Sequence, residues 1–199
     1  YQHEFWLDSD PERLPCVPLT AHAGGPLKVA GPVDDEDVVA QVWRADVGRV
    51  PLYLLDTDCP ENSTVGRWIT SRLYEGIASV RLAQYAVLGF GGAMVLERLG
   101  IDPSVFHINE GHPSFTLAQL MGKARLAGQG YDEAWSGARE RLVFTTHTPV
   151  PAGNETYDSG EAREMLHRVA SVTGDADRFL ATGRLDPADS EGRIGMTPL

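Results

Sequence analysis

Short apolar runs that alternate with helical segments are the feature of this sequence that most constrains its fold. Apolar residues that recur every three or four positions indicate helices, and short apolar runs that end in polar turns indicate strands. The predicted elements are residues 38–45 and 50–55 (a hairpin), 67–99 (mostly helix), 105–108 (strand), 114–126 and 131–141 (helices), 142–146 (buried strand) and 161–172 (helix). Strands that alternate with helices are typical of an α/β fold with a parallel, doubly wound sheet.

A cluster of glycines, Gly89-Phe90-Gly91-Gly92, interrupts the long predicted helix. Each glycine destabilises a helix interior by about 1 kcal/mol relative to alanine, so three in four positions indicate a break or close packing against another element. A phosphate-binding loop is the weaker interpretation, because the cluster lacks the Lys-Ser/Thr pair of such loops and does not follow a strand. We therefore expect close helix packing here.

The domain organisation is predicted from where prolines and glycines gather. Residues 1–36 contain five prolines and three glycines, and we expect a loop-rich lead-in there. Residues 37–199 are expected to form one partial domain. The chain starts with Tyr rather than Met, and residues 194–199 resemble the start of a new element, so we expect a longer natural polypeptide.

Charge and composition disfavour several classes of partner. The net charge is −11, which disfavours nucleic acid and anionic membranes, since both attract basic surfaces. The apolar run over residues 86–96 contains three glycines and is shorter than a membrane span requires. Two cysteines without a CxxC spacing favour a reduced, cytoplasmic protein over one with a disulfide.

Two polar loops carry the candidate chemistry, and each directly follows a predicted strand. In doubly wound sheets, ligands bind at the carboxyl ends of the strands, so loops 107–113 and 145–153 are expected to meet at one crevice. Imidazole, carboxylate and amide groups can each exchange hydrogen bonds with sugar hydroxyls. The candidate side chains are Asn109, Glu110, His112, His147 and Thr148.

Two other interpretations of these loops stay open. The first loop can simply end a strand, with Gly111 at positive φ and Asn109 as a helix cap. Alternatively, His107, Glu110, His112 and His147 are residue types that bind metals, as in a metal hydrolase. Their spacing matches no standard zinc signature, however, and we predict no metal ligands.

Several motifs, taken together and in order, resemble a known family. They occupy residues 52–58, 60–63, 69–74, 88–92, 99–101, 105–112 and 143–153 and cover most of the stretch from 38 to 157. In this order and spacing they resemble the bacterial short form of the α-glucan phosphorylases, the glycogen and maltodextrin phosphorylase family. The resemblance implies a segment of the N-terminal, Rossmann-like domain of a two-domain glycosyltransferase of the GT-B type.

The resemblance also implies an activity for the longer protein. It would be a hexosyltransferase of glycogen and maltodextrin metabolism that transfers the terminal glucosyl unit of an α-1,4-glucan reversibly to inorganic phosphate, giving α-glucose 1-phosphate. The family binds pyridoxal phosphate through a lysine of its C-terminal domain, and the cofactor's phosphate group takes part in proton transfer. That domain is absent here, so no residue of this chain is assigned to the cofactor, and we expect the segment alone to be inactive. The full-length protein could form a homo-oligomer.

For the site, the resemblance implies that His147 contacts the glucosyl unit, with its backbone carbonyl as a hydrogen-bond acceptor. Glu110 would orient the same sugar, and Thr148 would bind substrate. Asn109 and His112 would shape the loop and bind substrate beside it.

The sequence departs from the family at three places. Glu75-Gly76-Ile77 stands where relatives usually have Gly-Gly-Asp, Ala83-Gln84-Tyr85 replaces Arg-Gln-Glu, and Asn154 replaces a frequent His. These departures leave two alternatives: a non-catalytic glucan-binding remnant, or a different GT-B glycosyltransferase such as a nucleotide-sugar glucan synthase. We further expect a partial domain to leave sheet edges and an apolar face unpaired.

Overall fold

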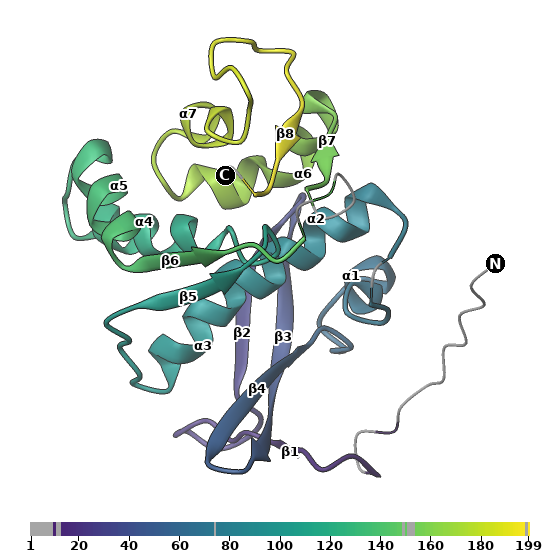
Figure 1. Ribbon diagram of the computed structural model, residues 1–199. Helices are drawn as coiled ribbons and strands as arrows, with labels where there is room; N and C mark the ends of the chain where they lie inside the picture. Colours follow the sequence, from purple (N-terminus) through teal and green to yellow (C-terminus); the bar gives the residue numbers. More distant parts are fainter. Residues whose placement is uncertain (1–9, 11–12, 74, 149, 151–153, 198) are drawn as a thin grey trace.

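The computed structural model describes residues 10, 13–73, 75–148, 150, 154–197 and 199 and is a mixed α/β structure (Figure 1). Parts of two motifs, namely Tyr74 and residues 149 and 151–153, lie outside the described residues. The strands are β1 (Val17–Pro18), β2 (Lys28–Val33), β3 (Glu36–Val47), β4 (Val50–Asp56), β5 (Phe106–Asn109), β6 (Leu142–Thr145), β7 (Thr156–Tyr157) and β8 (Ile194–Gly195). The helices are α1 (Thr64–Trp68), α2 (Ala78–Ala86), the π-helical η2 (Val87–Gly91), α3 (Gly92–Arg98), α4 (Thr116–Leu126), α5 (Tyr131–Glu140), α6 (Ser159–Ser171) and α7 (Ala176–Ala181).

An antiparallel sheet is built around the long strand β3, which pairs with β1, β2 and β4. The predicted hairpin is confirmed as β3 and β4, joined by a turn in which Gly48 has a φ of 61°. Strand β2 lies within the stretch that we predicted to be loop-rich, and that interpretation is wrong for Lys28–Val33. The glycine there marks a close approach rather than a turn, because a Cβ on Gly31 would lie 3.0 Å from the Phe90 ring.

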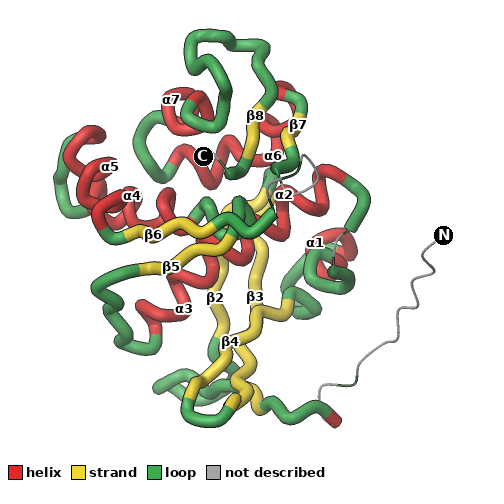
Figure 2. Tube along the Cα trace, viewed as in Figure 1, coloured by secondary structure: helices red, strands yellow, loops and turns green. Residues whose placement is uncertain are grey.

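One long helix crosses the middle of the molecule, as α2, η2 and α3 in succession (Figure 2). The glycine cluster does not break it but forms its π-helical turn. The prediction of a helix over 67–99 is wrong for residues 69–73 and 75–77, which are not helical. There Thr70 accepts a hydrogen bond from the backbone N–H of Thr57, and this ties the segment to the end of β4.

The central helix also corrects the estimate of apolar length. The helix Ala78–Arg98 has 21 residues and contains an 18-residue window with a mean hydropathy of 1.3, so by length and composition alone it is long and apolar enough to cross a membrane. The apolar run over 86–96 is only part of this helix, so its length underestimates the length of the apolar helix available to span a membrane. Within the fold, 56% of its most apolar stretch is buried, as in the core helix of a globular domain.

Strands β5 and β6 form a two-stranded parallel sheet, and α4 and α5 connect them. Among the described residues, neither strand pairs with a third one. The structure thus contains one strand–helix–strand unit, and a Rossmann-like doubly wound sheet is not confirmed. The prediction of a buried β6 is wrong, since Val143 and Phe144 are 49% and 42% exposed.

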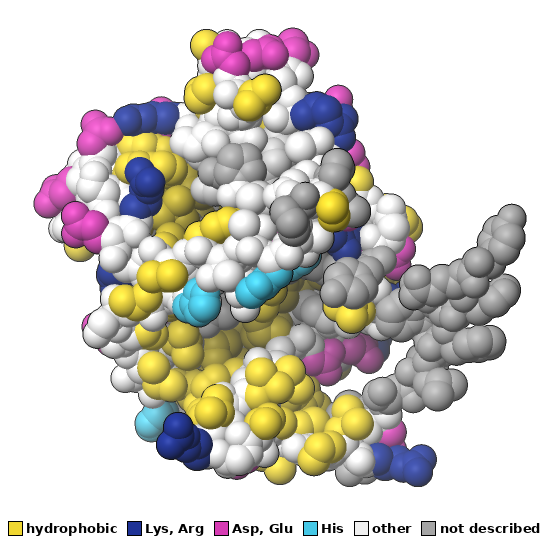
Figure 3. Space-filling model, in the orientation of Figure 1, with side chains coloured by type: hydrophobic (Ala, Val, Ile, Leu, Met, Phe, Trp, Pro, Cys, Tyr) yellow, Lys and Arg dark blue, Asp and Glu magenta, His cyan; other side chains and the backbone are white. Residues whose placement is uncertain are grey.

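An apolar groove of about 990 Å³ separates β5 from β4. Leucines from β4 and the central helix line it, including Leu54 and Leu88, which are exposed. Figure 3 shows it as a hollowed band of hydrophobic side chains below the histidines. An unpaired strand edge beside exposed apolar side chains agrees with the expectation for a partial domain.

The elements after β6, namely β7, α6, α7 and β8, pack over the end of the parallel pair (Figure 1). The predicted helix over 161–172 is confirmed as α6, which begins earlier because Asp158 caps it by accepting from the N–H groups of Gly160 and Glu161. Helix α7 and the strand pair β7–β8 were not predicted. Their fully buried side chains, among them Phe179 and Ile194, join the same core as Phe115 of the turn before α4.

Candidate functional site

The two predicted loops meet where the parallel strands end. Asn109 and Thr145 are opposite each other in the register, and the Glu110 N–H donates to the Thr145 carbonyl at 2.8 Å. The strands are parallel neighbours, so their carboxyl ends lie at the same edge and bring residues 109–112 and 146–148 together. The predicted meeting of these loops is confirmed.

Glu110 organises the second loop. Its carboxylate accepts hydrogen bonds from the backbone N–H of His147 at 2.5 Å, the N–H of Thr148 at 3.1 Å and the Thr146 hydroxyl at 2.8 Å. These bonds, the one from His147 first, hold the pKa of Glu110 below its ordinary value. The carboxylate is therefore ionised at neutral pH, and three of its roughly four acceptor positions are filled by the loop.

The backbone at Glu110 corrects one of the alternative interpretations. The residue at positive φ is Glu110, at 55°, and not Gly111. Gly111 is needed for space instead, since a Cβ there would lie 2.7 Å from the backbone and side chain of Met196. The left-handed conformation at Glu110 turns its carboxylate back towards the residues after β6.

His147 and Asn109 form a second contact across the same strand ends. The His147 Nε2 lies 3.3 Å from the Asn109 Oδ1, and both side chains are exposed. Asn109 therefore does not cap a helix, which was the alternative interpretation. His107 contacts Thr145 at 2.6 Å and lies two register pairs before Asn109 in the strands. No group of three or more potential metal-binding side chains comes together among the described residues.

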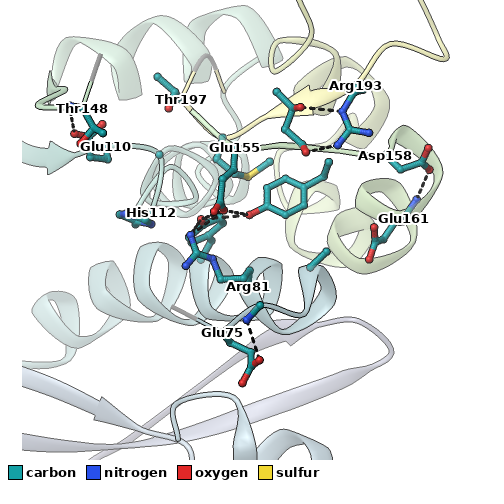
Figure 4. Close-up of a pocket in the computed structure, with 17 residues that line it drawn as sticks. Glu75, Arg81, Glu110, His112, Thr148, Glu155, Asp158, Glu161, Arg193 and Thr197 are labelled. Atoms are coloured by element: carbon teal, nitrogen blue, oxygen red, sulfur yellow. Dashed lines mark hydrogen bonds and ion pairs between the residues drawn. The ribbon is translucent and has the colours of Figure 1, made fainter. Parts of the chain in front are cut away.

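A polar cavity of about 660 Å³ opens beside this loop (Figure 4). Three of the five predicted site residues, Glu110, His112 and Thr148, line it, whereas Asn109 and His147 do not. Its other walls come from α2, from the segment around β7 and from the C-terminal residues. They include Glu75, Gly76, Arg81, Tyr85, Glu155, Tyr157, Asp158, Glu161, Arg193 and Thr197.

The departures from the expected family pattern gather at this cavity. Glu75, Gly76 and Tyr85 line its wall. Asn154 lies in the loop after β6, where its side-chain amide donates to the carbonyls of Thr148 and Val150, at 3.3 and 3.2 Å. Asn154 thus closes the loop on itself and keeps a structural role at the changed position.

The sequence interpretation missed a buried cluster at the floor of the cavity. Glu155 accepts hydrogen bonds there from Arg81, Tyr85 and Tyr157. The spacing held a signal: Arg81 and Tyr85 are four residues apart on a helix, and Glu155 and Tyr157 are two apart at a strand. Nothing in the sequence shows that these two pairs face each other.

His112 packs against this cluster, with its ring 5.2 Å from that of Tyr85. Burial first, and then the positive charge of Arg81, hold its pKa below the ordinary value of 6.5, against the opposing influence of Glu155 and Glu110. The folded chain therefore keeps His112 neutral to a lower pH than the unfolded chain does.

This shift predicts a loss of stability on mild acidification. As the pH falls through about 6.5, His112 in the unfolded chain takes up a proton and the folded chain does not, so the free energy of unfolding decreases. The variant His112→Gln should make this decrease shallower. Urea unfolding at pH values above and below this range measures it, with exposed His167→Gln as the control. An unchanged pH dependence in His112→Gln would contradict the assignment.

The lysines of this chain show whether it could attach a cofactor at this site. It has only two lysines, Lys28 and Lys123, and these pair with Glu61 and Glu97. Neither lysine lines the cavity. The chain itself therefore does not fit a cofactor bound to lysine at this site.

Comparison with known proteins completes the description of the site. No protein-family model matches the chain. It is 41% identical to the maltodextrin phosphorylase of Thermococcus litoralis over 92% of its length, and 38% identical to the glycogen phosphorylase of Aquifex aeolicus over 96%. It is 39% identical to the glycogen phosphorylase of Mycobacterium tuberculosis over 94%. The chain spans 22%, 28% and 23% of these relatives, respectively.

Proposed function

Because this chain belongs to the family of the glycogen and maltodextrin phosphorylases, as a segment of about a quarter of their length, we propose that it forms part of the glucosyl-binding side of an α-glucan phosphorylase. The complete polypeptide would transfer the terminal glucosyl unit of an α-1,4-glucan to inorganic phosphate and release α-glucose 1-phosphate. The segment alone would not catalyse this reaction.

The observation that supports this proposal best is the loop that Glu110 organises at the edge of the polar cavity. Backbone N–H groups of His147 and Thr148 point at the Glu110 carboxylate, so the loop is held in one shape before any ligand arrives. Such preorganised polar groups suit a neutral, hydroxyl-rich ligand, because each hydroxyl both donates and accepts.

The proposed roles combine the family resemblance with these positions, since His147 lies beside Thr148 at the edge of the cavity and does not itself line it. The His147 backbone carbonyl accepts a hydrogen bond from the glucosyl unit, and Glu110 fixes the loop that presents it. Thr148 and His112 contribute the wall of the cavity on the sugar side. Asn109 supports the His147 side chain from the end of β5.

The cofactor in this proposal belongs to the complete polypeptide. Pyridoxal phosphate would be bound there by a lysine outside this segment, across the cleft of a GT-B fold, and its phosphate group would supply acid–base chemistry. The two lysines of this chain lie in ion pairs away from the cavity, so this chain contributes sugar contacts and no cofactor attachment.

A non-catalytic glucan-binding protein is the second candidate, because the departures from the family pattern include residues of the cavity wall. Glu75, Gly76 and Tyr85 all line the cavity beside the proposed sugar site. This candidate predicts affinity for maltodextrin without turnover.

Phosphorolysis separates the two candidates. The complete polypeptide that contains this segment, supplied with pyridoxal phosphate, maltodextrin and phosphate, should release glucose 1-phosphate. The variant His147→Ala should reduce the rate about tenfold, a modest loss because alanine keeps the backbone carbonyl and loses only the contact with Asn109. Absence of release from a polypeptide with bound cofactor would overturn the phosphorylase proposal and leave the binding protein.

A further inference from the structure

The floor of the cavity contains a carboxylate that draws three donors together (Figure 4). The Glu155 Oε2 accepts from the Arg81 guanidinium at 2.8 Å, the Tyr157 hydroxyl at 2.9 Å and the Tyr85 hydroxyl at 3.2 Å. Arg81 also donates to the Tyr85 hydroxyl at 2.8 Å. Two elements that are more than 60 residues apart in the sequence are therefore joined at one oxygen atom.

The local structure explains why these four side chains converge. Arg81 and Tyr85 are one turn apart on α2 and lie on the same face of that helix. Glu155 and Tyr157 are two residues apart at the start of β7, so they point to the same side of an extended segment. For these two pairs to meet, the loop between β6 and β7 must bring Glu155 and Tyr157 next to α2.

The charge on Arg81 gives its contact with Glu155 a structural role. The Arg81 side chain is only 10% exposed, whereas that of Glu155 is 43% exposed. A guanidinium that far from water is stabilised by a partner of opposite charge, and Glu155 supplies a carboxylate at 2.8 Å. Burial, followed by the neighbouring Tyr85 and Glu155, also raises the pKa of Tyr157, so that this hydroxyl stays a donor.

One peptide link and a series of hydrogen bonds connect Glu155 to the proposed sugar site. The next residue back, Asn154, donates to the carbonyls of Thr148 and Val150. Thr148 in turn donates its N–H to Glu110. The loop is thus held at one end by Glu110 after β5 and at the other by the contact of Glu155 with Arg81 of α2.

We propose that Glu155 is a positioning residue whose ion pair with the buried guanidinium of Arg81 fixes the loop carrying His147 and Thr148 at the edge of the cavity. It acts through the backbone of that loop and does not touch the glucosyl unit. The inference rests on the proposed function only for the identity of the ligand that the loop binds. The anchoring of the loop by Glu155 is a property of this chain.

Amide hydrogen exchange on the 199-residue chain, followed by NMR, tests the anchor without any turnover. In Glu155→Gln, the N–H groups of His147 and Thr148 should exchange at least about tenfold faster, because their bonds to Glu110 depend on the loop's position. The Val42 N–H, which donates to Leu27 in the antiparallel sheet, should be unchanged. Asp102→Asn is the matched control, since it removes the carboxylate that pairs with Arg141 at 2.7 Å, before β5.

A second variant separates the charge pair from a general loss of structure. Arg81→Gln alone should accelerate exchange about as much as Glu155→Gln does, and the double variant Arg81→Gln/Glu155→Gln should be no faster than either single variant, because all three remove the same ion pair. If Glu155→Gln exchanges like the parent chain, or if the double variant regains the protection of the parent chain, the ion pair does not position the loop and the proposal fails.

Kinetics of the complete polypeptide distinguish this failure from failure of the proposed function. Glu155→Gln should raise the KM for maltodextrin about tenfold and lower kcat much less, because the loop is displaced from the bound sugar. An effect on kcat alone would count against positioning of the sugar contact. Faster exchange in the 199-residue chain, together with an unmodified polypeptide that releases no glucose 1-phosphate, would retain the anchor and overturn the phosphorylase reaction.

Discussion

Replacement of Glu110 by Ala in the complete polypeptide should lower the rate of glucose 1-phosphate release about 100-fold, the loss typical of a displacement of about 1 Å in a site. The carboxylate holds two backbone N–H groups and one hydroxyl of the neighbouring loop. Alanine cannot accept any of these bonds, so His147 and Thr148 lose their common anchor.

Two matched variants decide whether anchoring explains that loss. In Glu110→Gln the remaining amide oxygen can still accept from both backbone N–H groups, so we expect a loss of only about tenfold. Glu97 lies on the central helix away from the cavity, and its carboxylate pairs with Lys123 of α4. Glu97→Ala should therefore leave the rate unchanged. Equal losses for Glu110→Ala and Glu110→Gln would show that the negative charge itself matters, and a loss of less than threefold for both would remove Glu110 from the site.

The strand ends could be predicted from the sequence because their signals are local. The apolar runs before Asn109 and Thr146, and the helical period between them, predict two strands with crossover helices. Parallel strands bring their carboxyl ends together, so the meeting of Glu110 with residues 146–148 followed without knowledge of any contact.

Other features depend on tertiary contacts that a single sequence does not contain. Strand β2 carries Gly31 and Pro32, which signal a loop, and it forms because β3 pairs with it along six residues. The left-handed backbone falls on Glu110 rather than on the adjacent Gly111, because Gly111 is needed for contact with Met196. Backbone propensity alone predicts the left-handed conformation at Gly111, whereas packing places it at Glu110, one residue earlier.

The cluster around Glu155 shows the same limit for the site. Each pair of residues has a spacing that places it on one face of its own element. Their convergence depends on the path of the loop between β6 and β7, and no periodicity encodes that path. Besides these spacings, the presence of Arg81 in an otherwise apolar helical segment is a local signal, because such a charge requires a partner when the segment is buried.

Two glycines of the central helix are expected to respond oppositely to substitution by alanine. A Cβ on Gly89 would lie 2.9 Å from three backbone atoms, those of Pro113, Phe115 and Thr116, and backbone cannot move aside as a flexible side chain can. We expect Gly89→Ala to lower the free energy of unfolding by about 3 kcal/mol, at the upper end of overpacking effects. A Cβ on Gly92 would meet nothing within 4 Å, so Gly92→Ala should raise it by up to about 1 kcal/mol.

Urea unfolding of the two variants isolates the close approach at Gly89 from helix propensity. Both substitutions add one methyl group to the same continuous helix, so both gain a similar preference for helical backbone. The difference between them, roughly 4 kcal/mol, then measures the contact of η2 with the turn between β5 and α4. That turn contains His112 and leads directly from Glu110, so a shift forced at Gly89 would also displace the site. Equal effects of the two substitutions would show that the glycines serve the π-helical turn alone and that the helix does not support the cavity through this contact.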